Sequence, residues 1–177
     1  PNSLQQSWVG ALTRELRALE GQDFVDYSDL IALQTATQVA TVSAIAMGDF
    51  SNLLVFVAVD NNTSGSTAIS NATFDGDALT VLTSAASGDV ALHVYLGSGL
   101  AGVTGNLVIT ATDTTPSLKV YALKVSALKD TFGLGTMGTA VATTAPVTLG
   151  VTGLSSVEAG DLVASFVFTG LETNEVY

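Results

Sequence analysis

From about residue 37 onward the chain consists of short stretches rich in Val, Thr, Ala and Leu, separated by clusters of Gly, Asn, Asp and Ser. Segments such as "ALTVLTS", "DVALHVYL" and "NLVITAT" alternate apolar and polar residues with a period of two. Because successive side chains of a strand point to opposite faces, this alternation predicts strands with one buried face. We expect strands at residues 37–47, 52–60, 67–74, 78–84, 89–96, 104–112, 117–128, 140–151 and 161–169.

Nine short strands at regular spacing, without a helical pattern between them, predict an all-β fold, an antiparallel β-sandwich of jelly-roll or immunoglobulin-like kind. The first residues have a different pattern, because one broad face of a helix over residues 3–20 collects the apolar side chains, with Arg14 and Arg17 on another face and Gly21 placed to end the helix. The apolar face is formed by Leu4, Trp8, Leu12, Leu16 and Leu19.

Residues 22–34 form an acidic and aromatic connector in which Phe24, Tyr27 and Ile31 lie at helical spacing, so a short second helix is one alternative there. The domain prediction is therefore a helical arm and connector over residues 1–35 and a β-sandwich over residues 36–177. The arm packs either on its own domain or on a neighbouring subunit. In the second case its apolar residues, together with Phe24 and Tyr27, are the subunit contacts.

The charge content limits the partners of this chain. Five basic residues stand against sixteen acidic ones, which gives a formal net charge of -11. Such a surface repels phosphate backbones, so nucleic acid is not an expected partner. Charged residues make up only 12% of the chain, about half the usual share in soluble proteins. We therefore expect other subunits to cover part of the weakly charged surface.

The sequence excludes cysteine chemistry and does not predict a segment that crosses a membrane. There is no cysteine, so disulfides, thiolate nucleophiles and Cys-based metal sites are excluded. The longest unbroken apolar run, residues 53–59, is far too short to cross a bilayer, so no membrane partner is expected. The first residues lack the basic-then-apolar pattern of a secretory signal, and we expect synthesis in the cytoplasm of a host.

Two acidic segments are candidate cation sites. "DNNTSG", residues 60–65, matches the opening of the helix–loop–helix calcium motif, but the twelfth position is Asn71 instead of a bidentate Glu, and the flanks resemble strands. A loop between strands is the preferred interpretation. In "FDGDALTVL", Asp75 and Asp77 flank Gly76, which predicts a two-residue hairpin turn. No cofactor is predicted; a structural calcium ion would require Asp60, Asp75 and Asp77 to converge at one end of the sandwich.

No residue constellation predicts a catalytic site. The only histidine, His93, lies within a predicted strand, where we expect it to point from one sheet face toward solvent or a subunit contact. No nucleophile-elbow pattern precedes a helix. "GLGTMG", residues 133–138, matches the dinucleotide fingerprint, but the β-branched segment that follows, with Pro146, does not form the required helix. We therefore predict that the protein is not an enzyme.

The segment from residue 53 to residue 128 resembles the β-sandwich domains of phage virion and surface-associated proteins. In those domains an apolar strand leads through a polar loop to "VT(Y/F)-G-x-A-L-T", then to "V-x-L-(W/Y)-x-L", a Gly-rich link and "V-x-V-T". The matching elements here are residues 53–59, 72–80, 90–96 and 107–110, and "AGDLVASFVF", residues 159–168, is similar to a later strand of such domains. The resemblance implies adhesion, capsid decoration or tail architecture, without a catalytic set of residues.

The resemblance and the acidity together predict a structural virion protein, a capsid decoration or cement protein of a tailed phage, located on the capsid exterior. Its expected partners are other virion subunits, the major capsid protein among them, and copies of itself in a homo-oligomer. The alternative is a carbohydrate-binding or adhesion module on a cell or virion surface. A hydrolase on a sandwich scaffold is the third interpretation, and it would require His93 to lie beside a Ser or Asp in a cleft.

Overall fold

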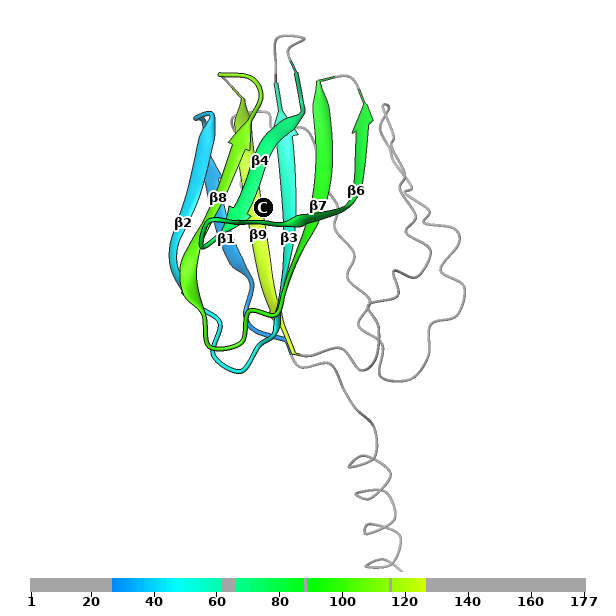
Figure 1. The fold of residues 1–177 in the computed structure, drawn as a ribbon. Helices are drawn as coiled ribbons and strands as arrows, with labels where there is room; N and C mark the ends of the chain where they lie inside the picture. The colour runs from blue at the N-terminus through cyan, green and yellow to red at the C-terminus, as the bar shows by residue number, and fades with distance from the viewer. Residues whose placement is uncertain (1–26, 62–65, 88, 115, 127–177) are drawn as a thin grey trace, which may run out of the picture.

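The computed structural model describes residues 27–61, 66–87, 89–114 and 116–126, and all regular secondary structure in these residues is β-strand (Figure 1). The strands are β1 (Ile31–Thr35), β2 (Val39–Ala46), β3 (Asn52–Asp60), β4 (Ile69–Phe74), β5 (Asp77–Ala78), β6 (Thr80–Ser87), β7 (Val90–Ser98), β8 (Thr104–Ala111) and β9 (Ser117–Val125). Within the same residues, no helix is long and apolar enough to span a membrane.

Seven of the predicted strands are confirmed, with small differences at their ends. The strand expected at residues 78–84 is found as β5 and β6, which only Leu79 separates. The strands expected at residues 140–151 and 161–169, and the helix expected at residues 3–20, lie outside the described residues.

The connector contains a strand that the sequence patterns did not predict. The alternative of a short helix reaching Ile31 is wrong, because Ile31–Thr35 form β1 and pair antiparallel with β9. Ile31, Leu33 and Thr35 are partly buried, and the two residues between them are exposed. The five residues therefore alternate with the period of a strand, and the helical spacing of Phe24, Tyr27 and Ile31 is outweighed by pairing with a segment far along the chain.

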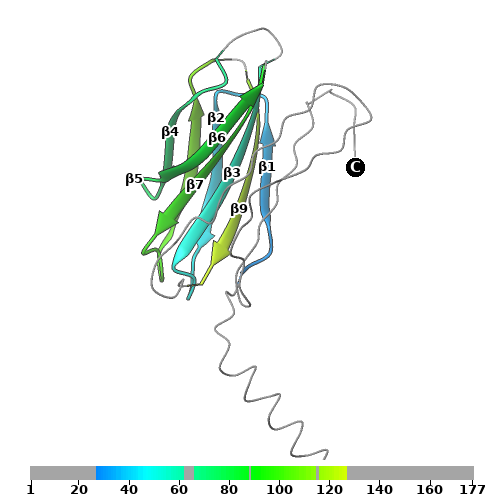
Figure 2. The ribbon, with the colours of Figure 1, turned by 90° about the vertical axis from the view of Figure 1, so that its right-hand side faces the viewer.

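The strands form two antiparallel sheets that pack face to face as a β-sandwich. The five-stranded sheet has the order β1-β9-β3-β7-β6, and the four-stranded sheet has the order β2-β8-β4-β5. Figure 2 shows β7, β3, β9 and β1 side by side. The central strand β3 pairs along its whole length with β7 on one side and β9 on the other. Most connections pass from one sheet to the other, which closes the sandwich at both ends.

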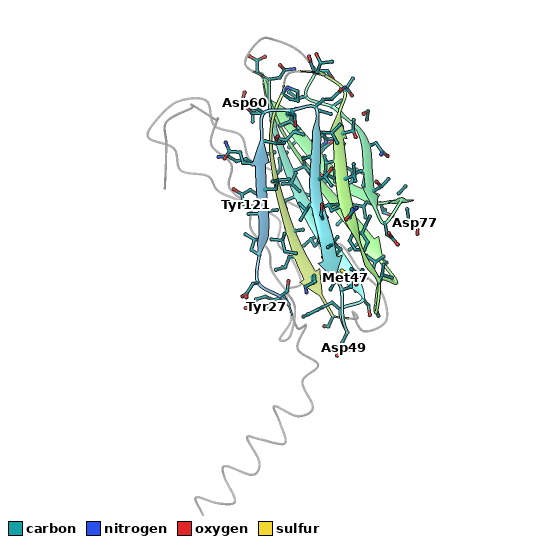
Figure 3. All side chains as sticks on the ribbon, turned by 90° about the vertical axis from the view of Figure 1, so that its left-hand side faces the viewer. Tyr27, Met47, Asp49, Asp60, Asp77 and Tyr121 are labelled. Atoms are coloured by element: carbon teal, nitrogen blue, oxygen red, sulfur yellow. The ribbon has the colours of Figure 1, made fainter. Side chains whose placement is uncertain are left out.

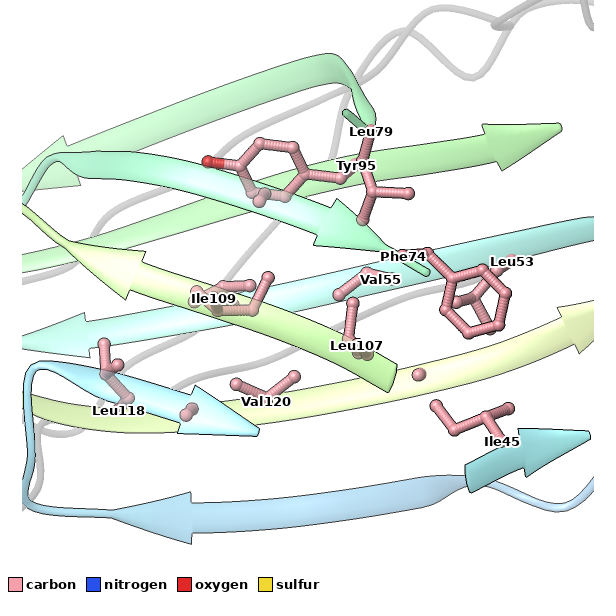
Figure 4. Close-up of a cluster of buried hydrophobic side chains, with 14 of the residues drawn as sticks. Ile45, Leu53, Val55, Phe74, Leu79, Tyr95, Leu107, Ile109, Leu118 and Val120 are labelled. Carbon is pink, nitrogen blue, oxygen red and sulfur yellow. The ribbon is translucent and has the colours of Figure 1, made fainter. Parts of the chain in front are cut away.

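The core lies between the two sheets and is built from alternate residues of each strand (Figure 4). Phe74 from β4 and Leu107 from β8 meet Leu53 and Val55 from β3, and all four are almost completely buried. Burying a side chain of this size contributes about 1.5–3 kcal/mol. The inward positions of β8 illustrate the pattern, because every second residue from Gly105 to Ala111 is buried.

The outward-facing sides of the two sheets differ in character. On the four-stranded sheet the outward residues are mostly Thr, Ser and Asn, and Thr41 of β2 and Asn71 of β4 are exposed. On the five-stranded sheet the outward residues of β3 include Phe56 and Ala58, which are 8% and 0% exposed. Their cross-strand neighbour Val94 is 5% exposed. The five-stranded sheet is therefore apolar and buried on both faces at its centre.

Candidate functional site

Tyr27 is the only predicted subunit-contact residue that the described part of the chain includes. The others, Leu4, Trp8, Leu12, Leu16, Leu19 and Phe24, lie outside the described residues. Tyr27 forms an isolated antiparallel bridge with Val125, and the amide of Ser28 donates a hydrogen bond to the carbonyl of Lys124 at 2.9 Å. The Lys124 amide in turn donates to the Ser28 hydroxyl at 3.1 Å. These bonds hold the chain against the end of β9 and fix the position from which Tyr27 projects.

Tyr27 and Leu30 form an exposed apolar pair, which we call the lower-edge patch. Their side chains are 63% and 54% exposed, and they precede β1 at the lower end of the sandwich, where Figure 3 labels Tyr27. Among the described residues, β1 pairs with β9 alone, so it is an edge strand of the five-stranded sheet. An edge strand presents unpaired backbone groups to a further chain. The lower-edge patch therefore combines apolar side chains with an available sheet edge.

The loop that begins with "DN" is held by a buried asparagine at the upper end of the sandwich. Asn61 is 1% exposed. Its amide donates to the carbonyl of Asp89 at 2.8 Å, and its Nδ2 donates to the carbonyl of Ser66 at 3.2 Å and to Oδ2 of Asp113 at 2.9 Å. Through its backbone amide and its side chain, this one residue ties three loops together. As predicted, the segment lies between two strands, because β3 ends at Asp60 and β4 begins at Ile69; residues 62–65 lie outside the described residues.

The three candidate calcium ligands lie in different parts of the sandwich. Asp60 ends β3 at the upper end and is 4% exposed, whereas Asp75 and Asp77 flank the turn between β4 and β5, which lies well below it (Figure 3). No group of three or more His, Cys, Asp or Glu side chains suited to a metal ion occurs in the residues described. The structure therefore does not bring Asp60, Asp75 and Asp77 to one cation.

The predicted hairpin turn at Gly76 is confirmed. Phe74 pairs with Asp77, so Asp75 and Gly76 form the two-residue loop. Their φ angles are 52° and 90°. Positive φ at both central residues defines the type I′ turn, whose twist matches that of the paired strands, and Asp-Gly is one of its preferred sequences. The two aspartates are thus accounted for by the geometry of the turn.

His93 lies on the inner face of the five-stranded sheet, which corrects the expectation that it points toward solvent or a subunit contact. It is paired with Val57, a fully buried core residue, and directly opposed residues share a face. Nε2 of His93 lies 2.8 Å from the carbonyl oxygen of Thr67, and the imidazole ring stacks on Tyr95 with centroids 6.4 Å apart. The histidine therefore fastens the loop before β4 to the upper end of the core.

A shallow pocket lies where the chain passes from β5 to β6 beside the end of β7. Its lining includes Phe74, Leu79, Gly97 and Leu100, and its volume is about 210 Å³. Pockets that hold cofactors or drug-sized ligands usually enclose about 300–1,000 Å³. The pocket is therefore small for such a ligand. The dinucleotide-like segment at residues 133–138 lies outside the described residues.

Sequence reasoning missed the roles of two residues described above, Leu30 and Asn61. Leu30 was not singled out, because the edge position of β1 depends on pairing with β9 and has no local signal. Asn61 was considered only as a calcium ligand or turn residue, although its burial gives it a structural role.

Comparisons with models of protein families, with curated proteins and with solved structures find no match for this chain.

Proposed function

We propose that this chain is a non-enzymatic structural protein of a virion, a decoration or cement protein on the capsid exterior of a tailed phage. The strand order supports a jelly roll over an immunoglobulin-like sandwich. If β5 and β6 are counted as one strand that bends from one sheet to the other, the described residues form eight strands in two sheets, with the connections of two Greek keys. Viral capsid domains are among the proteins that use this architecture, as are lectins.

The lower-edge patch is the observation that carries the proposal. An exposed Tyr and an exposed Leu stand beside an edge strand, in the connector that follows the predicted amphipathic helix. Aromatic residues next to unpaired backbone groups are typical of surfaces that bury area against another chain. We propose that the predicted helix over residues 3–20, with Phe24 of the connector and the lower-edge patch, fastens the subunit to the major capsid protein or to a sister copy.

The charge supports a position outside the shell. A net charge of -11 would be repelled by packaged DNA, whereas the outer surface of a capsid imposes no such penalty. Exposed Thr and Asn residues on the four-stranded sheet also suit a solvent-facing side. The proposed orientation therefore places the lower end toward the shell and the four-stranded sheet in solvent.

The second candidate function is a carbohydrate-binding or adhesion module, since lectins share the jelly-roll architecture. Sugar-binding platforms use exposed aromatic rings. Phe56, Phe74 and Tyr95 are buried, whereas Tyr27 is exposed. Among the aromatic residues that the structure describes, Tyr27 alone is largely exposed and gives a sugar one stacking surface, so the contact function has more support. Saturable binding of the isolated chain to a glycan array would favour the module instead.

The proposed location is tested by immunogold electron microscopy with an antibody against the purified chain, applied to particles from cells that produce it. Gold over the capsid shell of intact particles is the expected result. Gold confined to the tail, or found only on cell debris, would contradict the decoration role.

The proposed contact is tested by light scattering on the full chain. Trp8→Asp places a charge on the apolar face of the predicted arm, whereas the control Gln6→Asp adds the same charge on the opposite face. We expect the unchanged chain and the control to form the same oligomer and the Trp8→Asp chain to be a folded monomer. Equal masses for all three would exclude self-assembly through the arm.

A further inference from the structure

The outer face of the five-stranded sheet is a continuous apolar surface across three strands. Cross-strand pairing places Phe56 between Val94 of β7 and Tyr121 of β9, and residues that are directly opposed share a face. The same register adds a row of three leucines around Leu54 on one side and a row around Ala58 on the other, where the β9 residue is Lys119. We call this surface the apolar outer face; it consists of Leu54, Phe56, Ala58, Leu92, Val94, Leu96, Tyr121 and Leu123.

The centre of the apolar outer face is buried, although no described strand lies over it. Phe56, Val94 and Leu96 are 8%, 5% and 7% exposed, and Ala58 is 0% exposed. Neighbours within the same sheet cannot shield a Phe ring to this extent, because they stand beside it and leave its outward side open. Among the described residues, the four-stranded sheet packs against the opposite, inner face of this sheet. A further part of the protein must therefore cover this face.

We propose that the C-terminal segment of the same chain, residues 140–169, packs on the apolar outer face and forms a third layer. The described chain leaves β9 after Val125, and β9 is adjacent to β3 at the middle of the sheet. Residues 127–177 follow from that point. Because the segment starts beside the face, its effective concentration there is in the millimolar range, which favours it over a separate copy.

The sequence of this segment suits the face that it covers. "AVATTAPVTLGV", residues 140–151, contains no charged residue, and "DLVASFVFT", residues 161–169, carries Phe166 and Phe168 on alternate positions. A strand rises about 3.3 Å per residue, so nine residues span about 30 Å, the length of β3. Either stretch is long enough to cross the sheet from end to end, and both are apolar enough to replace water over Phe56.

The proposal is tested by photo-cross-linking in the full chain. Phe56 is replaced by the photoreactive analogue p-benzoylphenylalanine, the folded protein is irradiated, and the product is digested with trypsin. The last basic residue is Lys129, so residues 130–177 are released as one peptide, separate from the peptide that contains position 56. We expect a cross-link between these two peptides. The same analogue at Thr41, exposed on the four-stranded sheet, is the matched control and should give none.

Isotope labelling separates the same chain from a second copy. Unlabelled and nitrogen-15-labelled proteins are mixed, unfolded, refolded together and irradiated. Cross-linked peptides that are wholly light or wholly heavy support packing within one chain. Mixed light and heavy products would show that a second copy supplies the segment, and absence of the cross-link to residues 130–177 would overturn the proposal. If the Phe56 variant does not fold, Tyr121 on the same face carries the same test.

Discussion

The two sheets of this sandwich share a core but have opposite outer faces. The four-stranded sheet exposes Thr41 and Asn71, as expected for an antiparallel sheet with one face in water. The five-stranded sheet buries Phe56 and Val94 on the side that points away from the core. The outer face of the four-stranded sheet is therefore polar, whereas the five-stranded sheet is apolar on both faces. A protein built in this way has one side suited to solvent and one side that requires a cover.

The outer faces of the two sheets differ most at the centre of the five-stranded sheet. A charged residue introduced there should lower the stability more than one at any other site considered below. Val94→Asp places a carboxylate in a buried apolar site, and we expect a loss of about 3–5 kcal/mol in the free energy of unfolding. Thr41→Asp adds the same charge on the four-stranded sheet and should change the stability by no more than about 0.5 kcal/mol. Urea unfolding followed by circular dichroism measures both. Similar losses for the two variants would remove the distinction between the faces.

The upper end gives a second comparison, between a buried and an exposed asparagine. Asn61→Ala removes the two Nδ2 hydrogen bonds to Ser66 and Asp113 and should cost about 1–3 kcal/mol. Asn71→Ala, on the exposed face of the four-stranded sheet, should cost less than about 0.5 kcal/mol. Hydrogen exchange at residues 66–68 should accelerate in the first variant only. Unchanged exchange there would show that Asn61 does not hold the loops together.

The four-stranded sheet depends more on its turn than on its outer face. Gly76 has a φ of 90°, and a Cβ added there would meet no atom within 4 Å. Gly76→Ala should therefore cost about 1–2 kcal/mol through backbone strain alone. Asp77→Ala, one residue further on, is the control and should leave the thermal midpoint nearly unchanged. A larger loss for the control would show that the aspartate side chain, and not the turn conformation, stabilises this hairpin.

The stability of the protein should fall at alkaline pH because of a tyrosine in the core between the two sheets. Burial raises the pKa of the Tyr95 phenol above its ordinary value of 10.0. Above pH 10 the unfolded chain releases this proton while the folded chain retains it, so the stability falls as the pH rises. Below pH 10 both states keep the proton, and this contribution is constant. Tyr95→Phe should therefore flatten the decline in stability above pH 10. Urea unfolding of both proteins at a series of alkaline pH values measures this, and a decline as steep in Tyr95→Phe as in the unchanged chain would contradict a buried phenol.

Most of the sandwich could be predicted because its signals are local. The alternation of "NLVITAT" determines which face of β8 is buried, and Asp75-Gly76 specifies its own turn. β1 could not be found in this way, because its five residues acquire their strand conformation by pairing with Tyr121 and its neighbours, far along the chain. A local pattern contains no information about such a partner.

The candidate surfaces were harder to predict than the strands, although one signal was present. Residues 53–59, "LLVFVAV", form an unbroken apolar run, and such a run indicates a strand that is buried on both faces. The sequence predicts a strand there, but we did not infer from the run that both faces of the strand are covered. The edge position of β1, and hence the exposure of Leu30, depends on the order of strands in the sheet. Strand order is set by the whole topology, so no window of residues reveals it.

The double pairing of β3 also determines when the protein can fold as it leaves the ribosome. Both partners of β3 are synthesised later than β3 itself, because β7 ends at Ser98 and β9 at Val125. At about 5–20 residues per second, β3 waits several seconds for either partner. Until β7 emerges, β3 has no neighbour on either side, and until β9 emerges it keeps one unpaired edge, which is the condition under which strands aggregate. Soluble yield should therefore depend on how quickly β9 emerges, even where the stability of the finished protein does not change.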